Sequence, residues 1–225
     1  MSSAIKIRWY ETSGFTLMEM AIVMLIMGLL LGGLMMPLSQ QMLNSRISET
    51  KNTLNLVNDA LLGFAAQKGR LPCPDTDNDG RENGPPCASV EGYVPWADLG
   101  VGQFDGWHHR LRYRADNNFT PAGIIPDPPN TTSNLQIRSR AAVVLSVANP
   151  DAPAAIIFSC GKNGIPDLEN DANGTPNTAL ICDNLGAANT IYIQDIFAQN
   201  FYDDQLIILS KALLINRMVS AGIWP

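Results

Sequence analysis

The chain has few charged residues and no cluster of basic ones. Asp, Glu, Lys and Arg make up 16% of its 225 residues, and the formal net charge at pH 7 is −6. Proteins that bind nucleic acids use clustered Lys and Arg side chains to neutralise phosphates. Because an acidic chain without such clusters repels a phosphate backbone, we expect no nucleic-acid partner.

Sequence motifs of the common enzyme classes are also missing. The chain has no nucleophile elbow, no phosphate-binding glycine loop and no set of residues at zinc-ligand spacing. Its two histidines, His108 and His109, are adjacent, and adjacent side chains in a strand point to opposite faces. We therefore expect no enzymatic activity, and a membrane-tethered periplasmic enzyme is the least favoured function.

Ionisable residues are scarcest between Phe15 and Leu38, where Glu19 is the only one in an apolar run. A helix of this length covers the hydrocarbon core of a bilayer, about 30 Å thick. Lys6 and Arg8 precede the run, and positive charge beside a first membrane segment favours a cytoplasmic location for that side. The run therefore predicts a transmembrane helix with the N-terminus in the cytoplasm and the rest of the chain outside.

The residues at the start of this run, Gly-Phe-Thr-Leu-Met-Glu at positions 14–19, resemble the processing signal of type IV prepilins and type II secretion pseudopilins. The resemblance implies that a prepilin peptidase cleaves after Gly14 and methylates the new N-terminal Phe15. Residues 1–14 would then be a leader peptide. A secretory signal peptide is the competing interpretation, but its cleavage site follows a shorter apolar core, whereas Gly14 precedes this one.

The resemblance also implies a role for Glu19. In this family the corresponding Glu is thought to pair with the α-amino group of a neighbouring subunit's N-terminal Phe. An unpaired carboxylate in lipid costs on the order of several kcal/mol, so Glu19 needs a partner unless it reaches the lipid headgroups. We expect Glu19 to set the axial register of subunit assembly.

Beyond the apolar run the chain becomes polar but keeps a helical period. Apolar or small positions recur at alternating steps of four and three, as expected for one buried helix face: Leu43, Ile47, Thr50, Leu54, Val57, Leu61 and Phe64. Gly69 is a suitable helix end. We predict one N-terminal helix over residues 15–69, transmembrane over 15–38 and amphipathic over 39–69, that packs on the chain's own head rather than on another chain.

Residues 70–225 are predicted to form one globular head. Apolar runs predict strands at 141–147, 154–159, 190–193 and 205–209, and the first two should form the centre of an antiparallel sheet. Residues 115–140 predict a surface loop and residues 211–221 a C-terminal helix. The resulting fold class is α+β and pilin-like, with a long N-terminal helix packed on an antiparallel sheet.

All four cysteines, Cys73, Cys87, Cys160 and Cys182, follow the apolar run. Exported proteins commonly form disulfides, so we expect two. Four cysteines allow three pairings. The sequential one, Cys73 with Cys87 and Cys160 with Cys182, closes the shortest loops.

The loop between the first two cysteines carries Asp75, Asp77 and Asp79 followed by a glycine. This spacing occurs in calcium loops, where alternate side chains converge on one ion. An EF-hand would need an acidic residue at position 86, which is Pro86, so an EF-hand is excluded. We predict a candidate calcium site at the three Asp residues, completed by Glu82 or by backbone carbonyls; a solvated acidic turn is the alternative.

The loop between the other two cysteines repeats this alternation in a weaker form. Asp167, Glu169 and Asp171 alternate, but no Asp-x-Asp-x-Asp core is present. A second cation site there is the weaker prediction. The segment ending in Asp203 and Asp204 is predicted to be a turn.

The resemblance implies a structural subunit of a type IV pilus-like filament, a minor pilin on account of its long head. It would be inserted in the bacterial inner membrane with a periplasmic head before it enters a pilus or pseudopilus. Expected partners are prepilin peptidase, other pilin or pseudopilin subunits, the inner-membrane assembly platform and the membrane. The alternatives are a pseudopilin of type II secretion and a filament-tip adhesin that binds a ligand through its head loops. No cofactor is expected apart from the candidate calcium.

Overall fold

The computed structural model describes residues 14–146, 152–167, 170, 182, 189–198 and 201–224, without the side chains of residues 33–38. The chain separates into two compact units, Met1–Asn44 and Ser45–Pro225. Helix α1, Leu17–Lys68, begins in the first unit and ends in the second. The predicted leader, apart from Gly14, lies outside the described residues.

Among the residues that the structure describes, no helix is both long enough and apolar enough to cross a membrane. The transmembrane segment predicted over 15–38 includes residues 33–38, whose side chains lie outside the description. Membrane insertion therefore stays a prediction.

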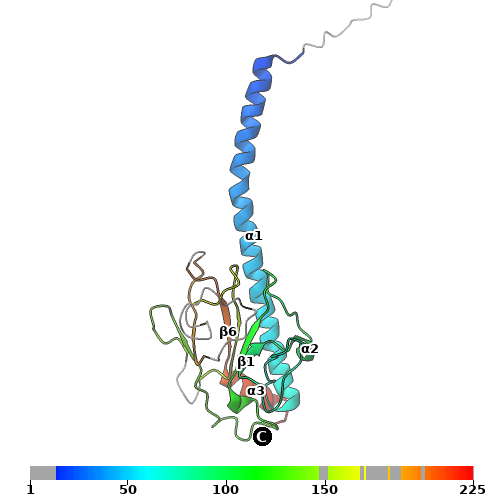
Figure 1. The fold of residues 1–225 in the computed structure, drawn as a ribbon, viewed down its shortest axis with the longest axis vertical. Helices are drawn as coiled ribbons and strands as arrows, with labels where there is room; N and C mark the ends of the chain where they lie inside the picture. The colour runs from blue at the N-terminus through cyan, green and yellow to red at the C-terminus, as the bar shows by residue number, and fades with distance from the viewer. Residues whose placement is uncertain are drawn as a thin grey trace, which may run out of the picture. The chain divides into compact units, whose positions relative to one another are not determined.

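In the described residues, the second unit contains a four-stranded antiparallel sheet, a two-stranded parallel sheet and three short helices besides α1 (Figure 1). The larger sheet has the strand order β1 (Glu91–Tyr93), β2 (Arg112–Ala115), β4 (Ala155–Ser159), β6 (Gln205–Leu209). The smaller sheet pairs β3 (Gln136–Arg138) with β5 (Ile191–Ile193). The helices are α2 (Trp96–Leu99), the 3-10 helix η1 (Asn117–Phe119) and α3 (Lys211–Ser220). The predicted α+β class, with an antiparallel sheet and a C-terminal helix, is confirmed.

Strand β4 lies at the centre of the head and is buried at every position. Because successive side chains of a strand point to opposite faces, β4 contributes to two cores. Ala155 and Ile157 join a core with α1 and α3 on one face of the sheet. Ile156 and Phe158 join a second core on the other face, which contains Tyr192 of β5 and the Cys160–Cys182 disulfide. The sheet is therefore covered by helices on one face and by the smaller sheet on the other.

The part of α1 within the second unit presents its predicted apolar face to the sheet. Val57 and Leu61 are fully buried in the first core, and Thr50 and Leu54 are buried as well. The adjacent Leu56, which falls off the stripe, is 62% exposed. The amphipathic pattern thus correctly identified the buried face of this segment.

This difference between neighbouring positions makes a testable prediction. Val57→Ala removes two buried methyl groups and should lower the free energy of unfolding by about 2 kcal/mol. Leu56→Ala, a larger truncation one residue earlier, should change it by less than about 0.5 kcal/mol. Urea denaturation of the full-length chain in detergent, followed by tryptophan fluorescence, measures both. Equal losses would mean that the helix does not pack through this face.

One strand prediction was wrong and one loop prediction was wrong in part. Residues 141–146 form no strand; their only described pairing is the isolated bridge between Arg138 and Val144, and residue 147 lies outside the description. The reason is that both edges of β4 are already occupied, by β2 and by β6. Conversely, the loop predicted over 115–140 contains β3, which is held by its pairing with β5. Strands 154–159, 190–193 and 205–209 were predicted correctly to within one residue.

The sequential disulfide pairing is the one that forms. Cys73 is bonded to Cys87 and Cys160 to Cys182. Both bonds lie in the head, each closing a polar loop that carries alternating acidic residues.

Candidate functional site

The N-terminal signal residues form a local hydrogen-bonded structure. Residues 14–16 are not helical, and α1 begins at Leu17. The Glu19 carboxylate accepts hydrogen bonds from the Thr16 backbone N–H and from Thr16 Oγ1, both at 2.9 Å. The Glu19 N–H donates in return to Thr16 Oγ1 at 3.3 Å.

This reciprocal arrangement is a capping box, in which a Thr and a Glu three residues later satisfy free N–H groups at a helix start. From the sequence, Glu19 was predicted to act only as a carboxylate in an apolar segment, and the role of Thr16 was not predicted. The Thr-x-x-Glu spacing at positions 16–19 was the signal that identifies it. Within a single chain, Glu19 therefore already has a partner.

The first turns of α1 bury no large apolar side chain. From Phe15 to Leu31 every large apolar side chain is at least 41% exposed, and Leu17 is 93% exposed. We call these residues the apolar surface of 15–31. Apolar surface this extensive on a single helix is costly in water and is typical of segments that contact lipid or protein.

The predicted calcium-loop residues do come together. Asp75, Asp77 and Asp79 each place a carboxylate oxygen within 4.8 Å of the others. However, Asp75 is engaged by the loop backbone: Oδ1 accepts hydrogen bonds from the Asp77 and Asn78 N–H groups, and Oδ2 accepts one from Gly80. Burial raises the pKa of Asp75, while these hydrogen bonds oppose the shift. The geometry is that of an acidic turn closed on its own backbone.

Glu82, one of the ligands suggested to complete this site, is used elsewhere. Its carboxylate forms a bidentate ion pair with Arg70, with both N–O distances 2.8 Å, and accepts a hydrogen bond from the Cys73 N–H. The pKa of Glu82 is lowered overall, with the Arg70 hydrogen bond and charge outweighing its burial. Calcium binding at Asp75, Asp77 and Asp79 stays a prediction, without Glu82 as a ligand.

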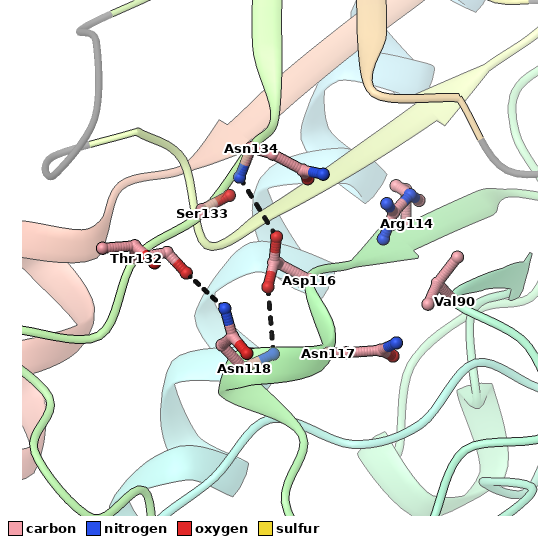
Figure 2. Close-up of a pocket in the computed structure, with 8 residues that line it drawn as sticks. All are labelled: Val90, Arg114, Asp116, Asn117, Asn118, Thr132, Ser133 and Asn134. Carbon is pink, nitrogen blue, oxygen red and sulfur yellow. Dashed lines mark hydrogen bonds between the residues drawn. The ribbon is translucent and has the colours of Figure 1, made fainter.

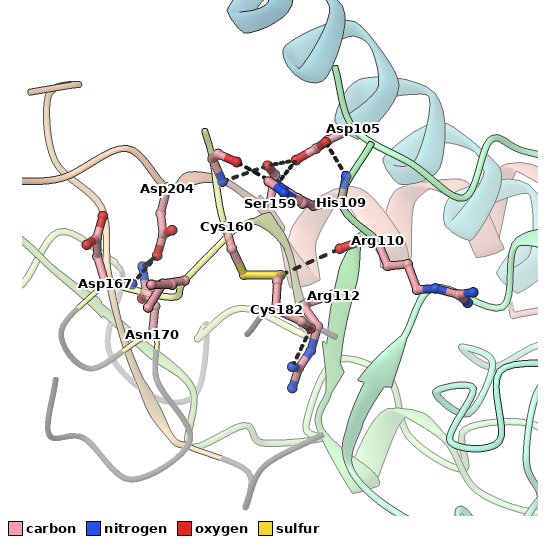
Figure 3. The surroundings of a disulfide bond; sticks show 12 residues. Asp105, His109, Arg110, Arg112, Ser159, Cys160, Asp167, Asn170, Cys182 and Asp204 are labelled. Atoms are coloured by element: carbon pink, nitrogen blue, oxygen red, sulfur yellow. Dashed lines mark hydrogen bonds and ion pairs between the residues drawn. A yellow bond between two sulfur atoms is a disulfide. The ribbon is translucent and has the colours of Figure 1, made fainter. Parts of the chain in front are cut away.

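A second group of carboxylates was only partly predicted. Asp167 lies close to Asp203 and Asp204, with one oxygen of each within 4.8 Å of the others. Glu169 and Asp171, the other residues of the predicted second site, lie outside the described residues. We call Asp167, Asp203 and Asp204 the head carboxylate cluster; Figure 3 shows two of its members, Asp167 and Asp204, beside Asn170.

Hydrogen bonds fix the members of the head carboxylate cluster to one another. The Asp167 N–H donates to Asp204 Oδ2 and the Asp203 N–H donates to Asp167 Oδ2, both at 2.8 Å. Asn170 donates its side-chain amide to Asp204 Oδ2, and the Asn163 N–H donates to Asp203 Oδ2. The loop that follows Cys160 is thereby joined to the segment before β6.

Burial and mutual repulsion make this cluster electrostatically unfavourable. Burial, together with the charge of Asp167, raises the pKa of Asp203 to about 6. The same two causes raise the pKa of Asp204 well above its ordinary value. A carboxyl pKa that is raised in the folded state means that ionisation of the group near neutral pH lowers the free energy of unfolding.

Asp105, His109 and Ser159 lie together beside this region but do not have the arrangement of a hydrolase triad (Figure 3). Ser159 Oγ, fully buried, donates to Asp105 Oδ2 at 2.6 Å rather than to the imidazole. His109 Nδ1 contacts the Gly161 carbonyl oxygen at 2.8 Å. In a hydrolase triad the serine hydroxyl would donate to the histidine. Here the Ser159 hydroxyl donates to the Asp105 carboxylate instead, and this hydrogen bond holds the Asp105 loop against β4.

A polar cavity of about 260 Å³ lies where β2 ends (Figure 2). It is lined by Val90, Arg114, Asp116, Asn117, Asn118, Thr132, Ser133 and Asn134. Asp116 accepts hydrogen bonds from the N–H groups of Asn118 and Asn134, and the Asn118 side chain donates to the Thr132 carbonyl. Ligand cavities are usually larger and mainly apolar. Since its polar groups bind one another, this cavity has the character of a loop junction.

Comparison with known proteins adds no relative: no family model, no curated protein and no solved structure matches the chain.

Proposed function

We propose that the chain is a structural subunit of a type IV pilus-like filament, a minor pilin that is cleaved after Gly14 and methylated at Phe15. The observation that carries this proposal is the apolar surface of 15–31, which starts directly after Gly14 and whose large apolar side chains are all at least 41% exposed. In this proposal, lipid covers that surface before assembly and the helices of other subunits cover it in the filament.

The position of Glu19 supports the same assembly mode. Cleavage after Gly14 would create an ammonium group at Phe15, next to Thr16, which already binds the Glu19 carboxylate. A carboxylate and an ammonium group satisfy each other's charge when water is excluded. We propose that Glu19 keeps its Thr16 contacts and adds the ammonium group of a neighbouring subunit as it enters the filament.

Substitutions at these positions separate the charge of Glu19 from its capping role. Glu19→Gln keeps an oxygen that can accept from Thr16 but removes the charge, so it should be processed normally and reduce incorporation into filaments about tenfold or more. Thr16→Ala removes the capping hydroxyl and keeps the charge, so it should assemble at nearly the wild-type level. Mass spectrometry of the N-terminus reports processing, and immunoblots of sheared filaments report assembly.

Two results would contradict the proposal. Wild-type assembly of Glu19→Gln would remove Glu19 from the assembly mechanism. Incorporation of an unprocessed Gly14→Leu chain into filaments would contradict the requirement for cleavage. A pseudopilin of type II secretion would give the same results in a pseudopilus, so the same variants test that alternative in a secretion system. A filament-tip adhesin would share this N-terminus and differ in binding a ligand through its head.

A further inference from the structure

Within the described part of the chain, the head carboxylate cluster has no compensating positive charge beside it. Asp203 and Asp204 are 3% and 4% exposed, and Asp167 lies beside them. Throughout the described residues, no Lys or Arg nitrogen lies within 4.0 Å of these three carboxylates. Three like charges in a buried site are strongly unfavourable unless a cation or protons neutralise them.

Two buried oxygen atoms of the cluster also lack hydrogen-bond donors. Oδ1 of Asp203 and Oδ1 of Asp204 are both shielded from solvent, and neither has a hydrogen-bond partner among the described residues. The Oδ2 atoms of the same residues do have donors, from Asn163 and from Asp167 and Asn170. A buried carboxylate oxygen without a hydrogen-bond donor is energetically costly. The hydrogen bonds to Oδ2 fix the orientation of each carboxylate, and therefore the position of its Oδ1 atom. Such atoms are the typical ligands of a hard cation.

The number of carboxylates indicates the kind of ion. One oxygen of each residue lies within 4.8 Å of the others, close enough for all three to bind one ion. Calcium accepts several carboxylates in a flexible geometry. Magnesium requires near-ideal octahedral geometry, keeps several water molecules and is usually bound by only one or two carboxylates. Three clustered carboxylates, two of them buried, therefore favour calcium.

The cluster also has a neighbouring cavity. Asp204 lines a cavity of about 180 Å³ between α1 and the start of β6, and Gln205 and Leu206 line it as well. Lys51 lines the same cavity without forming an ion pair with the cluster. The cavity places Asp204 next to space from which an ion and its water molecules can reach the carboxylates.

We propose that Asp167, Asp203 and Asp204 bind one divalent cation, calcium in preference to magnesium, and that this ion fastens the loop after Cys160 to the segment before β6. The site is separate from the Asp75–Asp79 loop. In that loop both oxygens of Asp75 are engaged by backbone N–H groups, and Asp77 and Asp79 are exposed.

Calcium titration of the full-length chain in detergent, after treatment with a chelator, tests the proposal. Saturating calcium should raise the melting temperature by about 5 °C, and an equal concentration of magnesium should raise it less. Asp204→Asn keeps an oxygen for its hydrogen bonds but removes one charge, and should weaken calcium binding in calorimetry about tenfold or more. Because it also relieves repulsion, this variant should be at least as stable as the wild type in chelator.

The matched control is Asp77→Asn together with Asp79→Asn, which removes two charges from the other acidic loop. It should retain both the calcium-binding heat and the rise in melting temperature. The proposal is overturned if calcium affects neither quantity in the wild type, or if magnesium binds more tightly. It is also overturned if Asp204→Asn binds calcium like the wild type, or if the control variant alone loses binding. Lower stability of Asp204→Asn in chelator would show a purely structural carboxylate, and would overturn it too.

Discussion

Replacing Arg112 with methionine should lower the free energy of unfolding by about 4 kcal/mol, because it leaves a buried carboxylate without its counter-charge. Arg112 forms an ion pair with Glu91, and the side chains are only 3% and 1% exposed. Arg112 also donates to the carbonyl oxygen of Cys182 at 3.1 Å. The Tyr192 hydroxyl donates to the other oxygen of Glu91. Urea denaturation of the full-length chain measures the loss.

This network explains why the cost should be large. Glu91 and Arg112 belong to β1 and β2 of the larger sheet, whereas Tyr192 belongs to β5 of the smaller one. Burial and the nearby Glu91 charge raise the pKa of Tyr192 well above its ordinary value, so Tyr192 stays protonated and can donate. The three side chains therefore join the two sheets, and removing the cation affects both of them.

The matched control is the exposed pair between Arg140 and Asp195. Its N–O distance is 3.4 Å and the Arg140 side chain is 43% exposed. Because water screens such a pair, Arg140→Met should cost less than about 1 kcal/mol. The double variant Glu91→Gln with Arg112→Met should recover part of the loss, since no buried charge remains unpaired. Equal losses for Arg112→Met and Arg140→Met would contradict this account.

Removing the Cys160–Cys182 disulfide should be nearly as costly. The bond closes a loop with a sequence separation of 22, for which chain entropy alone gives about 3 kcal/mol. Both sulfur atoms also belong to the second core, so replacing the two cysteines with alanine should cost about 1 kcal/mol more through lost packing. Denaturation curves of the oxidised wild type and the Cys160→Ala, Cys182→Ala variant give the difference.

The other disulfide serves as the comparison. Cys73–Cys87 has a similar sequence separation, 14, but Cys87 is only half-buried. Its removal should cost about 3 kcal/mol, almost entirely through chain entropy. A larger loss at Cys73–Cys87 than at Cys160–Cys182 would contradict the contribution from core packing.

Helices α1 and α3 and several strands could be predicted because their signals are local, whereas the short helices α2 and η1 were not predicted. The stripe through Leu54, Val57 and Leu61 repeats with the helical period, and the structure buries these residues. Strand β6 was predicted with its observed bounds, and α3 to within one residue. The segment predicted as a strand over 141–147 has the composition of a strand. A strand also needs a neighbouring strand with an unpaired edge, and the local sequence does not specify the order of strands in a sheet.

The acidic sites also divide into features that the local sequence predicts and features that depend on the tertiary structure. The three Asp residues of the 75–79 loop are close in sequence, so their convergence followed from spacing alone. Their engagement with backbone N–H groups, and that of Glu82 with Arg70, depends on how the loop closes. The head carboxylate cluster joins Asp167 to Asp203 and Asp204, which lie 36 and 37 positions further along the chain.

By itself, the sequence determined the buried face of α1 and indicated the sequential disulfides as the pairing with the shortest loops. Its Thr-x-x-Glu spacing at positions 16–19 also contained the capping box that begins α1. These features depend on residues that are near one another in the chain. Only the tertiary structure decided which acidic side chains are buried without a counter-charge, because burial and long-range proximity depend on strand order and on how the loops close against the sheet. The cation site that we propose therefore depends on Asp203 and Asp204, at a place where the sequence indicated only a turn.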